Sequence, residues 1–156
     1  MDDPDPAGNI ILQLLLLLVL ILVNAFFAMS EIAVISLNDN KIQKMAEEGH
    51  KKAKQILRLT ENSSNFLSTI QIGVTLAGFL TSASASQTFA DKLATAIAQP
   101  KVVAVIPYSV ISGFAMVVIT LIMSYFSLVL GELVPKKIAM QKPEKVSFLA
   151  VGPLLF

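Results

Sequence analysis

An almost unbroken apolar run at residues 10–37 restricts this chain more than any other feature of its sequence. It reads IILQLLLLLVLILVNAFFAMSEIAVISL, and the polar residues that interrupt it are Gln13, Asn24, Ser30, Glu31 and Ser36. A helix needs about 20 mainly apolar residues to cross the hydrocarbon core of a bilayer. The whole chain is 54% hydrophobic and only 15% charged, whereas soluble domains carry roughly 25% charged residues. We therefore expect an all-α integral membrane protein whose first span covers residues 10–37.

A secretory signal peptide is the alternative for this run, but such a peptide begins with a basic region. The residues that precede the run, MDDPDPAGN, contain three acids and no base. The sequence therefore favours a membrane span. Two further spans are expected at residues 66–90 and 102–134, where long apolar stretches return. The polar stretch 91–101 is expected to be a short connection between them.

Residues 39–61 form a charged segment that follows the first span. Its apolar residues recur at helical spacing, which is the pattern of an amphipathic helix lying on a membrane surface. A solvated linker is the alternative, because Gly49 weakens a helix at that position. His50 also lies here and is expected to be a solvated side chain. We predict a juxtamembrane helix over residues 39–61.

The basic residues predict the orientation of the chain. Ten of the twelve lysines and arginines lie either between the first two spans or after the third. Loops rich in lysine and arginine stay in the cytoplasm. The N-terminus is therefore expected outside and the C-terminus in the cytoplasm. With a net charge of +1 and no basic patch that alternates with aromatic residues, the sequence gives no indication of nucleic-acid binding.

A polar stripe runs down the first predicted span. At 100° per residue, Asn24, Ala28 and Glu31 fall on one helical face together with Gln13. Charged side chains inside a span cost about 2.5–3.5 kcal/mol on insertion scales, so they usually face a helix bundle or an ion pathway. Glu31 has an alternative placement near the lipid headgroups, because the run is longer than the hydrocarbon core.

The end of the third span combines Gly131, Glu132 and Pro135. Because proline has no N–H, Pro135 cannot donate to the carbonyl of Gly131 four residues earlier. A free carbonyl beside a carboxylate at membrane depth is a candidate site for a hard cation. The alternative is that Pro135 simply ends the helix and that Glu132 pairs with Lys136 or Lys137.

The ligands available for such a site are carboxylate, amide, hydroxyl and carbonyl oxygens, since the chain has no cysteine and its one histidine lies outside the spans. These oxygens favour Mg²⁺, Ca²⁺ or Na⁺ over Zn²⁺ or Cu²⁺. A compact site among small residues would suit Mg²⁺. No nucleophile with a neighbouring base and no phosphate-binding glycine loop is visible, so we do not expect an enzyme.

Four stretches together resemble the transmembrane domain of the CNNM and CorC family. They are LVNAFFAMSEIAVIS, TIQIGVTLAGFL, GELVPKKIA and the closing VGPLLF. The resemblance covers nearly the whole of residues 1–156. It implies a homodimeric, multi-pass domain of the plasma (inner) membrane that exports Mg²⁺ coupled to Na⁺. It further implies three spans, an external N-terminus and a belt of short re-entrant or juxtamembrane helices.

The resemblance also implies where a dehydrated cation would bind, between the three spans. The implied site uses Asn24 and the neighbourhood of Ala28, the backbone near Gly73 and Gly78, and Glu132. Family members often have serine at the positions of Asn24 and Ala28 and asparagine near Gly78. In this chain Asn24 keeps a side-chain oxygen, whereas Ala28 and Gly78 have none.

The family also carries a fourth hydrophobic segment and a cytoplasmic pair of nucleotide-binding CBS modules, which are absent from residues 1–156. The chain is therefore expected to be part of a larger protein and to bind no nucleotide itself. A second function of another class stays open, in which the domain is a membrane anchor and dimerisation scaffold for the CBS modules and transports nothing.

Overall fold

The structure is a computed structural model that describes the backbone of residues 6–155 and the side chains of residues 10–84 and 89–155. All regular elements within this part of the chain are helices. Three helical segments are long and apolar enough to cross a membrane, namely Ile10–Ile35, Ser63–Ile97 and Tyr108–Gln141. The expected all-helical fold with three candidate spans is therefore confirmed.

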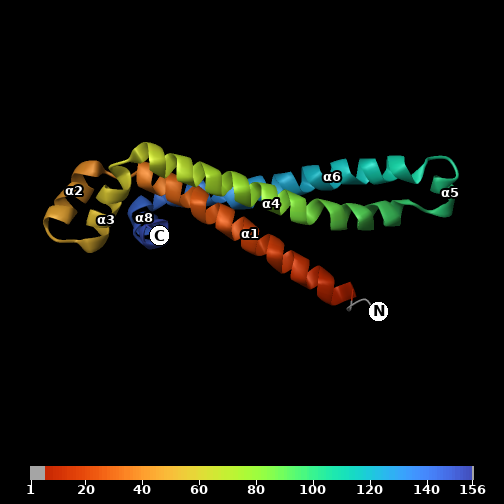
Figure 1. Ribbon diagram of the computed structural model, residues 1–156, viewed down its shortest axis with the longest axis horizontal. Coiled ribbons are helices and arrows are strands. Elements are labelled where there is room, and N and C mark those ends of the chain that lie inside the picture. Colours follow the sequence, from red (N-terminus) through yellow and green to blue (C-terminus); the bar gives the residue numbers. More distant parts are fainter. Residues whose placement is uncertain (1–5, 156) are drawn as a thin grey trace.

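The three long segments form an elongated bundle (Figure 1). Helix α1 (Pro6–Ile35) crosses the pair made by α4 (Ser63–Ile97) and α6 (Tyr108–Leu128). The helices α4 and α6 run side by side, and the short helix α5 (Pro100–Val103) closes their far end. After α6 the chain continues through η1 (Val129–Leu133) into α7 (Val134–Gln141), and both of these elements pack against α1.

The ends of the second and third spans differ from the expected bounds. Helix α4 runs on to Ile97, so most of the connection expected at 91–101 is helical. The third long helix starts at Tyr108 rather than at residue 102, because Pro107 stands at its N-cap with φ −57° and ψ 143°. Proline fixes its own φ and disfavours helical backbone in the residue before it, so it marks this start.

Residues 39–61 fold as two helices, α2 (Asp39–Glu47) and α3 (Lys51–Thr60), where one was expected. Gly49 separates them with φ of 96°, a left-handed conformation that glycine adopts at low cost. The N–H of His50 donates to the carbonyl of Met45 at 3.0 Å, which closes α2. His50 then caps α3, since its Nδ1 accepts from the N–H of Ala53 at 3.2 Å. It is therefore more than the solvated side chain that was expected.

The last helix, α8 (Pro143–Leu154), packs against α1 and α3 and completes the cluster in which the apolar faces of α2 and α3 are buried. Ile42 and Ile56 are each only 2% exposed and pack in one cluster with Val151 of α8 and Leu37 at the end of α1. The apolar face that was expected to lie on the bilayer is therefore buried against protein. We call α2, α3 and α8 together the head.

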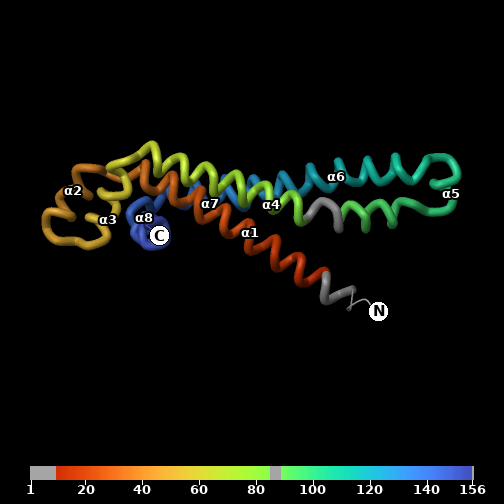
Figure 2. The backbone as a smooth tube through the Cα atoms, in the orientation of Figure 1, coloured from red at the N-terminus to blue at the C-terminus, as the bar shows by residue number. Residues whose placement is uncertain are grey.

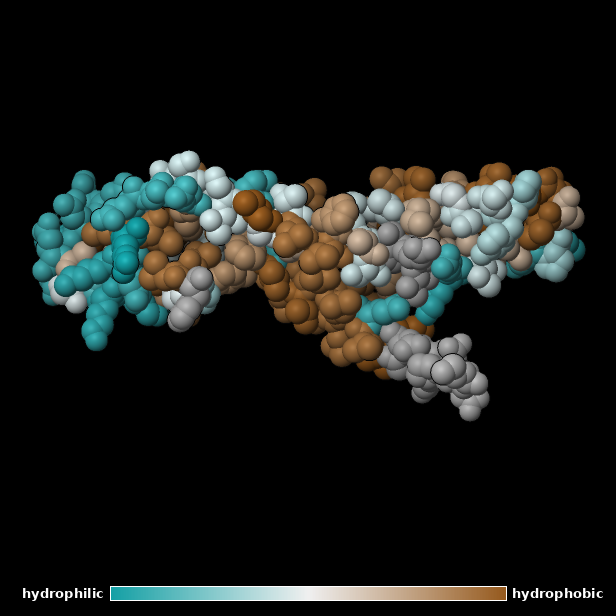
Figure 3. Space-filling model, viewed as in Figure 1, coloured by the Kyte–Doolittle hydropathy of each residue, from teal (hydrophilic) through white to brown (hydrophobic). Residues whose placement is uncertain are grey.

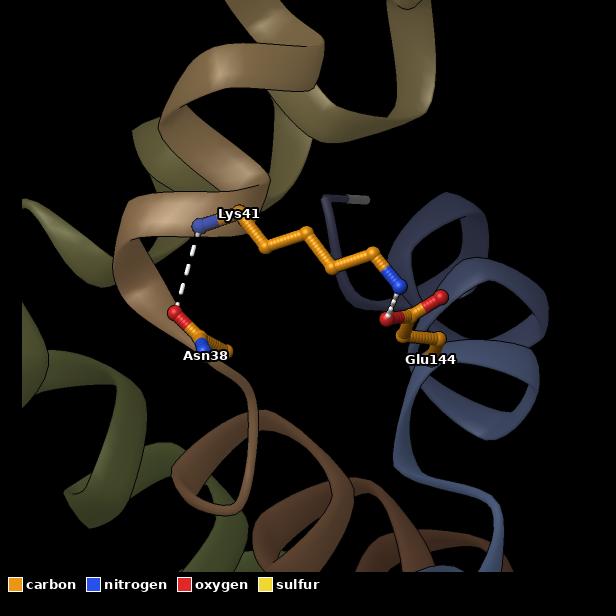
Figure 4. Close-up of polar contacts among 3 residues, drawn as sticks. All are labelled: Asn38, Lys41 and Glu144. Atoms are coloured by element: carbon orange, nitrogen blue, oxygen red, sulfur yellow. Dashed lines mark hydrogen bonds and ion pairs between the residues drawn. The ribbon is translucent and has the colours of Figure 1, made fainter.

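Polar contacts also join α8 to the helices that it covers. Lys41 on α2 forms an ion pair with Glu144 on α8 at 2.6 Å, while its backbone N–H donates to the side chain of Asn38 (Figure 4). On α3, Lys52 donates to the carbonyl of Phe148 at 2.9 Å. The ring of His50 stacks on the Phe148 ring at 5.1 Å. Figure 3 shows the hydrophilic surface of the head giving way to hydrophobic surface along α1 and α4.

Candidate functional site

One buried hydrogen bond joins the first and third spans. The side-chain amide of Asn24 on α1 donates to the carbonyl of Gly131 in η1 at 3.3 Å. Asn24 is 2% exposed, although it stands in a helix whose other face is covered with leucines. We call the contact of α1 with η1 and α7 the seam. Figure 2 shows α7 alongside the half of α1 that lies nearer the head.

The carbonyl of Gly131 is available to Asn24 because the helix widens there. In the π-helical turn η1 the N–H of Val134 donates five residues back, to the carbonyl of Val129. Pro135 follows and can donate to neither Leu130 nor Gly131. The helix nevertheless continues to Gln141. The alternative that Pro135 ends the helix is therefore wrong, because the wider turn accommodates the proline.

Glycine at position 131 allows this close approach. A Cβ there would lie 2.7 Å from Nδ2 of Asn24, closer than real Cβ contacts come. Gly73 plays a similar part on α4, where a Cβ would lie 2.9 Å from ring atoms of Phe27 on α1. By contrast, no atom lies within 4 Å of a Cβ built at Gly78. Two of the predicted glycines thus bring α1 close to its neighbours, and the third does not.

Two oxygen-bearing groups at the seam are without partners. The Oδ1 atom of Asn24 is buried and makes no hydrogen bond within the part of the chain that the structure describes. Glu132, next to Gly131, is half-buried and forms no side-chain hydrogen bond or ion pair with the described residues. A buried polar atom left unpaired costs about 1–3 kcal/mol, so such atoms often mark places where a ligand binds.

The other polar residues near the seam do have partners. Lys136 pairs with Glu31 at 3.7 Å, so the expected alternative in which Lys136 pairs with Glu132 is not what the structure contains. The hydroxyl of Ser30 donates to the carbonyl of Phe26 at 2.6 Å. Ala28 is fully buried and brings no ligand of its own. Among the described residues, Glu132 is thus the acid of the seam that pairs with no lysine or arginine.

The pairing of Lys136 with Glu31 was missed in the sequence, although a signal for it exists. Helices α1 and α7 run in the same direction (Figure 2). Once Asn24 lies beside Gly131, residues one to two turns further along the two helices are also brought near one another. Glu31 also lines a cavity of about 470 Å³ with Ser68 and Gln71 of α4.

The described residues contain no group of three or more histidine, aspartate or glutamate side chains that could hold a metal ion. A cation at the seam would therefore rely on one carboxylate together with amide and backbone oxygens. Such a mixed, oxygen-only set suits a hard cation that keeps part of its water shell, as Mg²⁺ does. The residues present at the seam are compatible with that chemistry.

Comparison with known proteins reveals relatives along nearly the whole chain. UPF0053 protein sll0260 of Synechocystis is 37% identical over 147 residues, which are 90% of this chain and 31% of the relative. UPF0053 protein YhdP of Bacillus subtilis is 33% identical over 146 residues, 94% of this chain and 32% of the relative. The chain thus spans about a third of the length of these relatives.

A shorter match links the chain to a protein of Escherichia coli named polyamine export protein, which is 37% identical over 68 residues. That alignment covers 44% of this chain and 15% of the relative. The family described as Cyclin M transmembrane N-terminal domain matches residues 15–156, which include the seam and the head. The resemblance found in the sequence is thereby confirmed, and the chain belongs to the CNNM family as its transmembrane N-terminal domain.

Proposed function

We propose that this domain transports Mg²⁺ across the plasma membrane and binds the ion at the seam between α1 and η1. The observation that carries the proposal is the unpaired Oδ1 of Asn24, buried next to the Gly131 carbonyl and followed in η1 by the unpaired Glu132. A buried acceptor and an uncompensated carboxylate are both stabilised when a cation arrives. The domain acts by binding and release, with no chemical reaction.

The hydrogen bond between Asn24 and Gly131 suggests how the seam takes up the ion. Rotation of the Asn24 amide exchanges its nitrogen and its oxygen, so that Oδ1 replaces the N–H that now faces the carbonyl. The carbonyl and Oδ1 would then both face a cation, with Glu132 supplying the negative charge. The remaining positions of the octahedral shell of Mg²⁺ are filled by water.

The proposal extends to the assembled protein. The domain works as a homodimer, exports Mg²⁺ in exchange for Na⁺, and is regulated by cytoplasmic CBS modules in the longer protein. The head then faces the cytoplasm, because it carries most of the basic residues. The resemblance to the family and the charge pattern support these features, and each is tested separately from ion binding.

A flux assay tests the transport function. The chain is reconstituted in proteoliposomes that contain a fluorescent Mg²⁺ indicator, and Glu132→Gln is compared with Glu47→Gln, an exposed acid of the head. We expect Glu132→Gln to reduce Mg²⁺ flux at least about a hundredfold, since a neutral amide no longer offsets the charge of the ion. Glu47→Gln should retain flux.

The scaffold alternative predicts a different result. If the wild-type chain is folded and inserted but moves no Mg²⁺, with or without a Na⁺ gradient, the transport function is contradicted. The anchoring role would then stand, and it could be checked by the oligomeric state in detergent. Binding of Mg²⁺ that is unchanged by Glu132→Gln would contradict the assignment of the site.

A second candidate substrate is an organic polycation, because one relative is named polyamine export protein. A single carboxylate with nearby carbonyl and amide oxygens can also accept hydrogen bonds from an ammonium group. The same proteoliposomes, loaded with labelled spermidine, separate the two substrates. Spermidine flux that depends on Glu132, together with absent Mg²⁺ flux, would replace Mg²⁺ by a polyamine.

A further inference from the structure

A cavity of about 420 Å³ lies away from the seam, where α3, the start of α4 and the end of α8 meet. One wall is polar and carries Arg58, Asn62, Asn65 and Thr69. Arg58 lies on α3, Asn62 lies in the turn between the two helices, and Asn65 and Thr69 lie one turn apart on α4. The other wall is apolar and is formed by Leu59, Phe66, Ile70, Leu154 and Leu155.

Among the described residues that line this cavity, Arg58 is the one that carries a charge. It has no acidic partner among the residues that the structure describes, although Lys41 and Glu144 elsewhere in the head do pair. Asn62 stands at the N-cap of α4 but makes no capping hydrogen bond with its side chain. The polar wall therefore offers a free guanidinium and a free amide, both of which donate hydrogen bonds.

The cavity also lies at a particular depth. Its polar wall includes the residues at which the apolar segment Ser63–Ile97 begins, so it sits at one end of a candidate span. At that level a bilayer presents phosphate groups, with glycerol and acyl chains immediately below them. A polar wall with one cation facing a wall of leucine, isoleucine and phenylalanine matches both parts of such a molecule.

We propose that this cavity binds the phosphate headgroup of an anionic phospholipid from the leaflet nearest the head. Arg58 binds the phosphate oxygens in a bidentate manner, as a planar guanidinium does. Asn62 donates a further hydrogen bond from its side-chain amide. The first carbons of the lipid lie against Leu154, Leu155 and Ile70. The site is separate from the seam and does not depend on the ion that the seam transports.

Native mass spectrometry of the detergent-solubilised chain tests the proposal, with dioctanoyl phosphatidylglycerol as the probe. We expect saturable binding of one lipid per chain and weaker binding of dioctanoyl phosphatidylcholine, whose net charge is zero. Arg58→Gln should weaken phosphatidylglycerol binding about tenfold or more, because it removes a charge-assisted pair. Arg58→Lys should fall between, since an ammonium keeps the charge but not the planar geometry.

Lys54→Gln is the matched control, since Lys54 is an exposed base one turn earlier on α3 and does not line the cavity. General attraction of a base to an anionic surface is worth about 1 kcal/mol, which is roughly fivefold in affinity, so Lys54→Gln should lose no more than that. Equal losses in Arg58→Gln and Lys54→Gln would overturn the proposal, because they would indicate diffuse charge attraction.

A change on the apolar wall provides a second, independent test. Leu155 is 40% exposed, so Leu155→Asp should leave the helices intact, as circular dichroism can verify. It places a carboxylate inside the cavity and should weaken phosphatidylglycerol binding as much as Arg58→Gln does. Unchanged binding would show that the lipid does not occupy this cavity. Displacement of the lipid by inorganic phosphate would show that the site takes a free anion and would overturn the lipid assignment.

Discussion

The head and the seam are two helix contacts in one small domain, and they are built differently. In the head, large side chains such as Ile42 and Ile56 fill a common core, and Lys41 and Glu144 at its rim are paired, although the buried hydroxyl of Ser147 has no hydrogen-bond partner among the described residues. In the seam, glycine and alanine let the helices approach, and one hydrogen bond of 3.3 Å crosses a contact that leaves an amide oxygen and a carboxylate unpaired.

The two contacts therefore differ in whether they mainly stabilise the fold or offer polar groups to a ligand. Burial of apolar side chains against one another stabilises a contact that need not change. Close backbone approach with unpaired polar atoms gives less stability, but it leaves groups that a ligand can satisfy. We therefore expect the head to be a fixed support, whereas the seam is the contact at which we propose that a cation binds.

The largest stability loss should come from the core of the head. Ile42→Ala removes a side chain that is 2% exposed, and such deletions cost about 2–5 kcal/mol through lost burial and the cavity left behind. Hydrogen exchange of the α2 and α3 amides should accelerate accordingly. Ile138→Ala, at a position that is 47% exposed, is the control and should leave that exchange unchanged. Slow exchange in Ile42→Ala would contradict the role of this core.

A smaller loss is expected from the seam. Gly131→Ala puts a Cβ 2.7 Å from Nδ2 of Asn24, and overpacking of this kind typically costs about 1–3 kcal/mol. The free energy of unfolding in detergent and the Mg²⁺ flux should both fall. Gly78→Ala is the matched control, because nothing lies within 4 Å of its Cβ. There the better helix propensity of alanine should add up to about 1 kcal/mol. Equal changes of unfolding free energy and Mg²⁺ flux in the two variants would show that the close approach of Gly131 to Asn24 does not matter for either property.

The smallest effect should follow from the ion pair at the rim of the head. The side chains of Lys41 and Glu144 are 58% and 40% exposed, and exposed pairs contribute no more than about 1 kcal/mol. Glu144→Gln should therefore shift the thermal unfolding midpoint only slightly, and added salt should erase the difference. Glu47→Gln gives the baseline, since Glu47 is an exposed acid that forms no ion pair with the described residues. A loss as large as that of Ile42→Ala would mean that charge, rather than apolar burial, holds the head.

Much of the fold could be predicted from the order of residues alone. The long runs of leucine, isoleucine and valine are too apolar to be exposed to water, and their lengths match the hydrocarbon core of a bilayer. The three spans and the all-helical class could therefore be predicted from them. The family could be identified because its motifs, such as GELVPKKIA, are local. Two residues of the proposed site, Asn24 and Glu132, stood out because each is polar within an otherwise apolar segment.

The remaining features depend on contacts between residues that are far apart in the chain. An amphipathic pattern at 39–61 is the same whether the apolar face meets lipid or α8, so burial of Ile42 against Val151 could not be seen. A proline can end a helix or be absorbed by a wider turn. In this chain the π-helical turn accommodates Pro135. The carbonyl of Gly131 then accepts a hydrogen bond from the side-chain amide of Asn24, 107 residues away. Nothing near Pro135 in the sequence encodes that partner.

The π-helical turn has a consequence for the third span as a whole. One additional residue in a helix rotates everything beyond it by about 100° relative to everything before it. The third span can therefore pack α6 against α4, and η1 and α7 against α1, without a break in the helix. Removing one residue between Val129 and Leu133 would rotate Lys136 away from Glu31 while leaving the α4–α6 hairpin in register. The π-helical turn therefore determines which side chains of α7 face α1.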